Sequence, residues 1–137
     1  MMIYRQGNGL EGLRLSEVID LYRASGLGER RPVDDRPRMQ RMLEGANLVV
    51  SAWDGERLVG LARSLSDFSY CTYLSDLAVH ADVQRRGVGR NLVRETQAAG
   101  APATVFLFSA PAAVDYYPRI GFSKGSGWLL RSSDPLL

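Results

Sequence analysis

Three features of the sequence predict an α/β domain in which helices are layered on a mixed sheet. Segments with helical spacing of apolar residues alternate with short apolar runs of strand length. The spacing changes from strand to helix across a glycine-containing loop after Val79. Residues 103–108 form a continuous apolar run, which is typical of a strand buried on both faces. The length of 137 residues fits one domain over 1–137.

The first part of the chain predicts two helices joined by a polar loop. Ser16 is expected to cap a helix that runs to about Ser25, and Gly26 is its stop. After the arginine-rich loop 26–37, Pro37 suits the first turn of a second helix. The residues that these helices would bury are Leu15, Val18, Ile19 and Tyr22 in the first, and Met39, Met42 and Leu43 in the second.

The middle of the chain predicts three strands. Residues 47–53 and 57–64 form a hairpin around the tight turn Asp54-Gly55, and residues 73–79 form a third, core strand. Side chains alternate between the two faces of a strand. On the third strand, we therefore expect one face of the sheet to carry Tyr73, Ser75 and Leu77. The opposite face would carry Leu74, Asp76 and Ala78.

The last part of the chain predicts two further helices and a closing strand. Residues 87–97 have Val88, Leu92 and Val93 on one helical face. Pro111 opens another helix, which is expected to end near Tyr117 because Pro118 disfavours helix before it. Residues 128–131 are predicted as a final short strand, so about four helices flank the sheet.

Composition excludes several classes of protein. Charged residues make up 23% and the net charge is +2, which is too small to indicate nucleic-acid binding. Cys71 is the only cysteine and His80 the only histidine, so neither an intrachain disulfide nor a closed zinc site is expected. The N-terminus has no signal-peptide pattern and no apolar run spans a bilayer, so we expect no membrane partner and a cytoplasmic location.

The loop after the third core strand predicts an anion site. The first N–H groups of a helix lack intrahelical partners and carry a partial positive charge. Here glycines open the helix and arginines surround its start, which indicates a pyrophosphate site made mostly of main chain. The alternative is a simple turn with solvated arginines. The residues concerned are Gln84, Arg85, Arg86, Gly87, Val88, Gly89 and Arg90.

Two stretches of the chain resemble the GNAT superfamily of N-acetyltransferases. Residues 84–89 match its Q/R-x-x-G-x-G/A signature, and residues 113–122 resemble its second signature, A-x-x-[FY]-Y-x-x-x-G-F. The resemblance implies a mixed, mostly antiparallel sheet with two splayed central parallel strands, here 73–79 and 103–108. It also implies acetyl-CoA as cosubstrate in the cleft between those strands, and no metal.

The resemblance assigns binding residues as well. Main-chain groups of Leu77 and Val79 would pair with the pantetheine arm, and N–H groups of the loop would hold the pyrophosphate. Ser109 would replace an asparagine that the family often has at the position of Ala110. The expected cofactor-binding set is therefore Leu77, Ala78, Val79, Gln84, Arg85, Arg86, Gly87, Val88, Gly89, Arg90 and Ser109.

Two side chains are candidates for catalysis. An amine with a pKa near 10.4 is neutral in only about one of 2,500 molecules at pH 7, so a group must accept its proton. Asp76 lies on the strand beside the expected thioester and is the first candidate, but it could equally hold a loop or order substrate. Tyr117 matches the family's tyrosine near the thioester sulfur, where it would stabilise or protonate the leaving thiolate.

The expected activity is transfer of acetyl from acetyl-CoA to a primary amine by direct attack in a ternary complex. The acceptor is a small molecule or a peptide, and Tyr70 and Tyr73 are its expected contacts, although these aromatics could instead cover core. The alternative function is a CoA-binding sensor without transfer activity. An exposed C-terminal strand would also allow two copies to pair as a homodimer.

Overall fold

Five strands form one mixed sheet in the first part of the chain. The computed structural model describes residues 1–137 as two compact units, 1–107 and 108–137. The sheet belongs to the first unit, and its spatial order follows the sequence. Neighbouring strands are antiparallel except for the last pair, which is parallel. The strands are β1 (Met2–Gly7), β2 (Leu48–Asp54), β3 (Arg57–Ser66), β4 (Cys71–Val79) and β5 (Thr104–Phe106).

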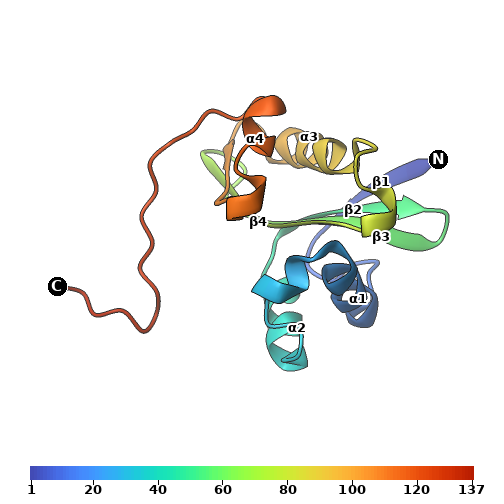
Figure 1. Cartoon of the computed structure of the whole chain (residues 1–137), viewed down its shortest axis with the longest axis horizontal. Coiled ribbons are helices and arrows are strands. Elements are labelled where there is room, and N and C mark those ends of the chain that lie inside the picture. The colour runs from blue at the N-terminus through green and yellow to red at the C-terminus, as the bar shows by residue number, and fades with distance from the viewer. The chain divides into compact units, whose positions relative to one another are not determined.

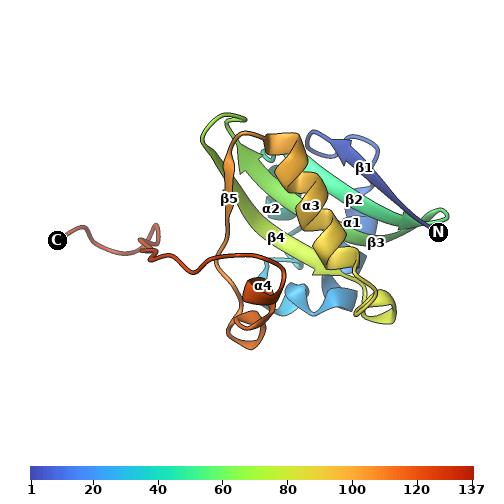
Figure 2. The ribbon, with the colours of Figure 1, turned by 90° about the horizontal axis from the view of Figure 1, so that it is seen from above.

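Three α-helices cover the two faces of this sheet. The helices are α1 (Leu15–Ser25), α2 (Arg36–Glu44) and α3 (Val88–Gly100), and a short 3₁₀ turn, η1 (Leu27–Arg30), follows α1. Helices α1 and α2 lie on one face, whereas α3 runs across the other (Figure 1 and Figure 2). Each face therefore has its own buried cluster of apolar side chains. The predicted fold class, helices layered on a mixed sheet, is confirmed.

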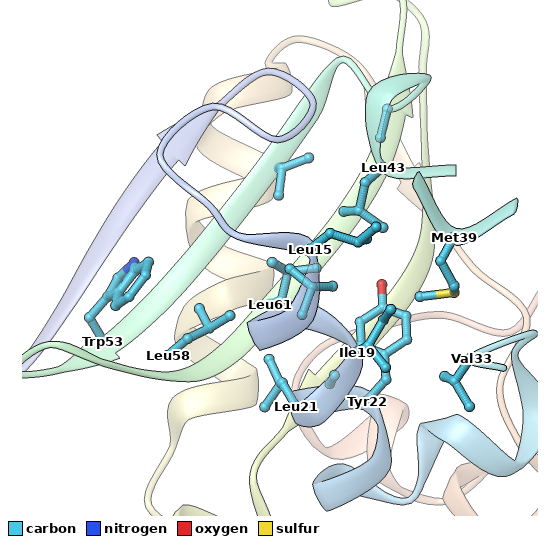
Figure 3. Close-up of a cluster of buried hydrophobic side chains, with 14 residues drawn as sticks. Leu15, Ile19, Leu21, Tyr22, Val33, Met39, Leu43, Trp53, Leu58 and Leu61 are labelled. Atoms are coloured by element: carbon cyan, nitrogen blue, oxygen red, sulfur yellow. The ribbon is translucent and has the colours of Figure 1, made fainter. Parts of the chain in front are cut away.

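The cluster under α1 and α2 is the larger of the two. Tyr22, Met39, Leu43 and Leu61 are completely or almost completely buried in it, and Figure 3 shows them converging from both helices and from β3. Removing such side chains costs about 2–5 kcal/mol of stability each, because the surrounding structure cannot refill the space. Met42, which was expected in the same buried stripe, is only partly buried.

The helix termini agree with the predictions in part. Gly26 ends α1 in the left-handed conformation, with φ 88°, as expected. Ser16 does not cap α1, because the helix begins one residue earlier and Arg14 stands at the cap without a side-chain hydrogen bond. Helix α2 begins at Arg36, so Pro37 lies in its first turn, and the Asp35 side chain accepts a hydrogen bond from the Arg38 N–H at 3.2 Å.

Strand β1 is absent from the sequence prediction. It pairs with β2 at one edge of the sheet, from Met2 opposite Asp54 to Gly7 opposite Val49. Its residues are exposed or only half-buried along the whole strand. An edge strand of this kind lacks the strong apolar alternation on which the predictions of β2, β3 and β4 rested.

Strand β5 is shorter and less buried than predicted. The apolar run 103–108 contains only three strand residues, Thr104–Phe106, which are exposed or half-buried. The reason is topological, because β5 lies at the edge of the sheet with β4 as its single neighbour. The expected parallel pair thus exists, but its second member is not central.

Because β4 contains a bulge, its side chains do not divide between the two faces of the sheet as predicted. Arg63 of β3 lies opposite Asp76, and the next residue, Ser64, lies opposite Leu74, so Ser75 has no partner on β3. Leu74 packs in the cluster under α3, whereas Ala78 packs in the cluster under α1. Leu74 therefore does not share a face with Asp76 and Ala78, because the extra residue switches the two faces.

The second unit contains only short helical turns. These are η3 (Pro111–Ala113) and α4 (Tyr116–Arg119), in place of the one predicted helix from Pro111 to Tyr117. Pro118 lies inside α4 and is tolerated there, because N–H groups in a first helical turn have no intrahelical partner. The predicted strand at 128–131 does not form, and Trp128 is 93% exposed.

Candidate functional site

Strands β4 and β5 are paired over a short distance only. Their parallel register runs from Cys71 opposite Thr104 to Tyr73 opposite Phe106 and then ends. Strand β4 continues to Val79, so its edge from Leu74 onwards has no neighbouring strand on that side. In Figure 2, β5 runs past the start of β4, and helix α3 crosses the sheet above them. The two strands thus separate, as the family resemblance implied.

The direction of the main-chain groups along this open edge follows from the pairing with β3. The His80 N–H donates to the Val59 carbonyl at 2.8 Å. In an antiparallel ladder, hydrogen-bonded pairs recur at every second residue, so the next bonded pair is Ala78 with Leu61. Leu77 and Val79 lie between these positions and therefore turn their N–H and C=O groups towards the open edge. An extended ligand could bind there as an added strand.

The open edge leads to the start of helix α3. Gly87 caps this helix in the left-handed conformation, with φ 78°, and contributes no side-chain cap. The first intrahelical bond joins the Asn91 N–H to the Gly87 carbonyl at 3.0 Å. The N–H groups of Val88, Gly89 and Arg90 therefore have no acceptor within the helix. Uncapped donors at a helix N-terminus favour an anionic ligand.

The loop before α3 adds positive charge to this helix start. Arg85, Arg86 and Arg90 are all exposed, and Arg85 has an unusual positive φ of 67°. Asp82 is the nearest acidic residue of the loop, and Arg57 binds its carboxylate at 3.0 Å. This hydrogen bond is the main cause that lowers the pKa of Asp82. Because Arg57 offsets the Asp82 charge, the arginines of the loop remain available to an anion.

Gln84 links the loop to the open edge of β4. Its Nε2 atom donates to the Val79 carbonyl at 3.1 Å. This contact fixes the spacing between the main-chain groups of β4 and the start of α3. The structure thus brings together most of the predicted cofactor-binding residues, namely Leu77, Ala78, Val79, Gln84, Arg85, Arg86, Gly87, Val88, Gly89 and Arg90.

Asp76 lies in a different environment, under α1. Its carboxylate is completely buried and accepts hydrogen bonds from the Tyr22 hydroxyl at 2.7 Å, from Arg31 Nε at 2.6 Å and from Arg63 Nε. Burial alone raises the pKa of this carboxyl. The hydrogen bond and charge of Arg63, followed by the charge of Arg31, outweigh burial and hold the pKa below its usual range.

These contacts argue against the general-base role predicted for Asp76. A base must have a lone pair directed at the proton that it removes and a pKa matched to the reaction. The Asp76 carboxylate is ionised, strongly stabilised and bound by four side chains, since the Ser75 hydroxyl also donates to it at 3.2 Å. The alternative that the sequence left open, a carboxylate that holds a neighbouring loop, fits better, because Arg31 lies in the segment that joins η1 to α2.

Sequence reasoning missed the partners of Asp76. Tyr22 was assigned to the apolar stripe of α1, and its ring is buried there, but its hydroxyl donates to Asp76. Burial first, and then the Asp76 charge, raise the pKa of Tyr22 well above its usual value, so the phenol stays neutral. Arg63 is a buried charged residue within the apolar run of β3. A single charge in such a run was the only sequence signal of a buried ion pair.

The remaining predicted site residues are spread over both units. Tyr73 stacks on Phe106 of β5, with ring centroids 5.3 Å apart. Tyr70 is 83% exposed in the turn before β4, where the Asp67 carboxylate accepts three backbone N–H bonds that lower its pKa to about 2. Ser109 and Tyr117 belong to the second unit, in which Tyr117 packs edge-on against Phe122 at 5.4 Å.

The site thus combines two separating parallel strands of a mixed sheet, an open strand edge and a helix start without a side-chain cap. The model of one family, described as the acetyltransferase (GNAT) domain, matches residues 25–127. The chain therefore belongs to the GNAT acetyltransferase family. The match includes residues of both structural units.

Two relatives found by sequence are uncharacterized N-acetyltransferases. The uncharacterized N-acetyltransferase ycf52 of Pyropia yezoensis is 28% identical over 122 residues, which cover 82% of this chain and 70% of the relative. The ycf52 protein of Porphyra purpurea is 33% identical over 72 residues, or 50% of this chain. That match spans 41% of the Porphyra protein, so this chain corresponds to less than half of its length.

Solved structures share the fold over almost the whole chain. A GNAT-family acetyltransferase from Streptococcus pneumoniae superposes with a TM-score of 0.74 at 25% identity and covers 96% of this chain and 100% of its own. An aminoglycoside N-acetyltransferase solved in complex with CoA superposes with a TM-score of 0.72 at 17% identity, covering 97% and 95%. The second likeness concerns the fold alone.

No helix of the chain has the length and apolar character needed to cross a membrane. Nor do three or more histidine, cysteine, aspartate or glutamate side chains come together in a group that could hold a metal ion.

Proposed function

We propose that the chain transfers an acetyl group from acetyl-CoA to a primary amine. One observation carries this proposal: the open main-chain edge of β4 leads directly to the uncapped start of α3. An acyl-CoA has a pantetheine arm rich in amide groups and a pyrophosphate at its far end. The edge offers strand-like partners for the amides, and the helix start offers N–H donors for the phosphates.

The binding residues divide between these two parts. Leu77 and Val79 would pair with the pantetheine arm through their main chain, and Ala78 between them points into the core. N–H groups from Arg85 to Arg90 would hold the pyrophosphate, and Gln84 would position this loop through its hydrogen bond to Val79. Ser109, from the second unit, is proposed from family resemblance as a further pantetheine contact.

The reaction requires a neutral amine at the thioester. Acetyl-CoA supplies the activated acyl group: a C–N bond forms, the C–S bond breaks and its electron pair stays on sulfur. The amine nitrogen loses one proton and the sulfur gains one, so the products are an amide and the free thiol. Providing the neutral amine costs roughly 4.6 kcal/mol at pH 7 for an amine of pKa about 10.4. Because the Asp76 carboxylate is already occupied by side-chain donors, water is the proposed acceptor of that proton.

Tyr117 is proposed to stabilise the leaving thiolate. A phenol with a pKa near 10 donates a hydrogen bond to a thiolate of pKa about 8.5 more readily than it gives up its proton, because full transfer is uphill by about 2 kcal/mol. Family resemblance supports this role, since Tyr117 stands in the second GNAT signature.

The alternative is a CoA-binding sensor without transfer activity. The observation that favours it is the saturated carboxylate of Asp76, because its loss as a base leaves no side chain assigned to that role. Two measurements separate the functions. Calorimetry with CoA tests binding, and release of free thiol from acetyl-CoA with a panel of amines tests transfer. Binding without amine-dependent thiol release would support the sensor, and absence of CoA binding would reject both.

A further inference from the structure

The buried network around Asp76 contains more positive than negative charge. Arg31 and Arg63 both bind the single carboxylate of Asp76, and Tyr22 contributes only a neutral hydroxyl. The side chains of Asp76 and Arg63 are 0% and 9% exposed, so this excess is largely shielded from water. Buried charges in proteins are normally paired, and two guanidinium groups that share one carboxylate leave one positive charge uncompensated.

Arg31 is the end of this network that a ligand can reach. Its side chain is 21% exposed, which is more than that of either Asp76 or Arg63. Its Nη2 atom donates to the Ser75 carbonyl at 2.8 Å, and its Nη1 atom donates to the Arg30 carbonyl at 2.8 Å. With Nε on Asp76, three of the five guanidinium N–H donors are used, and one remains on each terminal nitrogen.

Arg31 also stands near the point where β4 and β5 separate. Ser75, whose carbonyl it binds, lies two residues beyond Tyr73, and Tyr73 forms the last pair with β5. The proposed thioester lies along that separating edge. An acceptor that approaches from the face of α1 and η1 therefore comes within the field of Arg31.

An apolar row lies on the same face of the sheet. Leu65 is two residues after Arg63 on β3, and so on the same side of that strand, and it pairs with Tyr73, which in turn pairs with Phe106. Leu65 and Phe106 are 44% and 43% exposed. This row, Leu65–Tyr73–Phe106, offers contact to an apolar or aromatic group and no charge.

We propose that the acceptor is an amino acid with an apolar or aromatic side chain, whose carboxylate binds Arg31 and whose side chain packs on the Leu65–Tyr73–Phe106 row. Guanidinium binds carboxylate strongly because the planar fork of donors matches the two oxygens. A polycationic amine would instead be repelled by the excess charge of the network. This inference rests on the proposed acetyl transfer and adds the chemical class of the acceptor.

The test compares acceptors that share a side chain and an amine but differ in the carboxylate. Phenylalanine, phenylalanine amide and phenethylamine form such a series, and spermidine represents polycations. We expect kcat/KM for phenylalanine to exceed that for its amide about tenfold or more, the size of effect that a charge-assisted hydrogen bond provides. The carboxylate itself favours the charged, unreactive form of the amine, so chemical reactivity alone would give the opposite order.

Variants of Arg31 link this preference to the network. Arg31→Gln should reduce the ratio of kcat/KM between phenylalanine and its amide to about one, and Arg31→Lys should retain part of it. Arg30→Gln is the matched control, because this neighbouring side chain is exposed and makes no ion pair in the structure. The ratio is informative even if a variant is less stable, since general damage lowers both rates together.

The outcomes separate this inference from the proposed function. If wild-type protein acetylates the amide, phenethylamine or spermidine better than phenylalanine, the carboxylate proposal is wrong and acetyl transfer stands. The same conclusion follows if Arg31→Gln leaves the ratio unchanged. If no amine is acetylated, calorimetry of phenylalanine with the CoA-loaded protein decides, because absence of binding would also reject the acceptor class. If CoA itself does not bind, the proposed function fails first.

Discussion

The two sides of strand β4 differ in how completely their polar groups are paired. Towards the start of α3, the main-chain N–H groups of Val88, Gly89 and Arg90 lack acceptors within the helix. Towards α1, the Asp76 carboxylate is buried and bound by four side chains. Unpaired donors are costly unless a ligand or water satisfies them, whereas a saturated network stabilises the fold. We therefore assign ligand binding to the first side and structural stability to the buried part of the second.

Replacing Asp76 should produce the largest effect on stability. Asp76→Asn leaves the buried Arg63 guanidinium and the partly buried Arg31 guanidinium without a counter-charge, and we expect a loss of about 3–5 kcal/mol in the free energy of unfolding, measured with urea. Asp82→Asn is the control, because solvent screens its exposed pair with Arg57 and stability should change little. Similar urea midpoints for Asp76→Asn and Asp82→Asn would contradict the structural role assigned to the buried network.

The same network predicts how stability depends on pH. The pKa of Asp76 is lower in the folded protein than in the unfolded chain, where it is about 3.9. Its contribution is therefore fully present above about pH 4 and is lost as the pH falls through the folded value. Unfolding at a series of pH values should show this loss in the wild type and a flatter curve in Asp76→Asn.

A change at the helix start should abolish ligand binding without unfolding the protein. Gly87→Glu places a negative charge where the pyrophosphate is proposed to bind, and we expect CoA affinity to fall by about 100-fold or more in calorimetry. A Cβ atom at Gly87 meets no other atom within 4 Å, although the positive φ adds strain. Gly87→Ala has the same strain, roughly 1–2 kcal/mol, but no charge, and should still bind CoA. Equal affinities in both variants would reject the phosphate assignment.

Removing the Tyr117 hydroxyl should slow turnover while leaving the cosubstrate bound. Tyr117→Phe is expected to lower kcat roughly 100-fold, the size observed when a donor to a developing negative charge is lost. CoA affinity should stay close to the wild-type value. Tyr116→Phe is a close control, since it removes the same atom from the adjacent residue. Unchanged kcat in Tyr117→Phe would remove this side chain from the mechanism.

The smallest effect is expected at Gln84. Gln84→Ala removes one hydrogen bond to the Val79 carbonyl, and we expect CoA to bind about two- to tenfold more weakly. Adenosine 3′,5′-diphosphate and pantetheine, tested separately, should bind as they do to the wild type, because each contacts only one of the two regions that Gln84 connects. Weaker binding of a fragment would show direct contact instead.

Local sequence patterns were sufficient to predict those features that a single residue or the spacing of apolar residues determines. Gly26 ends α1 in the left-handed conformation, and Gly87 opens α3 after the predicted loop. The separation of β4 and β5 was also expected, but only from the resemblance to a family.

The features that the sequence did not predict have a common origin in long-range contacts. Nothing near Asp76 in sequence indicates that Arg31 and Tyr22, both far away along the chain, saturate its carboxylate. Strand β1 forms because β2 offers an edge, and most of the run 103–108 is exposed or half-buried because only β4 borders it. Single-domain organisation over 1–137 and pairing into a homodimer stay predictions.

The unpaired residue Ser75 has a consequence for how the chain can evolve. Upstream of this bulge, side chains of one parity face α3, and downstream the same parity faces α1. Deleting Ser75 would leave Leu74 and Asp76 adjacent and still opposite Ser64 and Arg63, so the ladder would become regular and both side chains would keep their faces. Loss of a residue between Asp76 and Val79 would instead exchange the faces of every later residue of β4. The bulge therefore marks where β4 can change in length without exchanging interior for exterior.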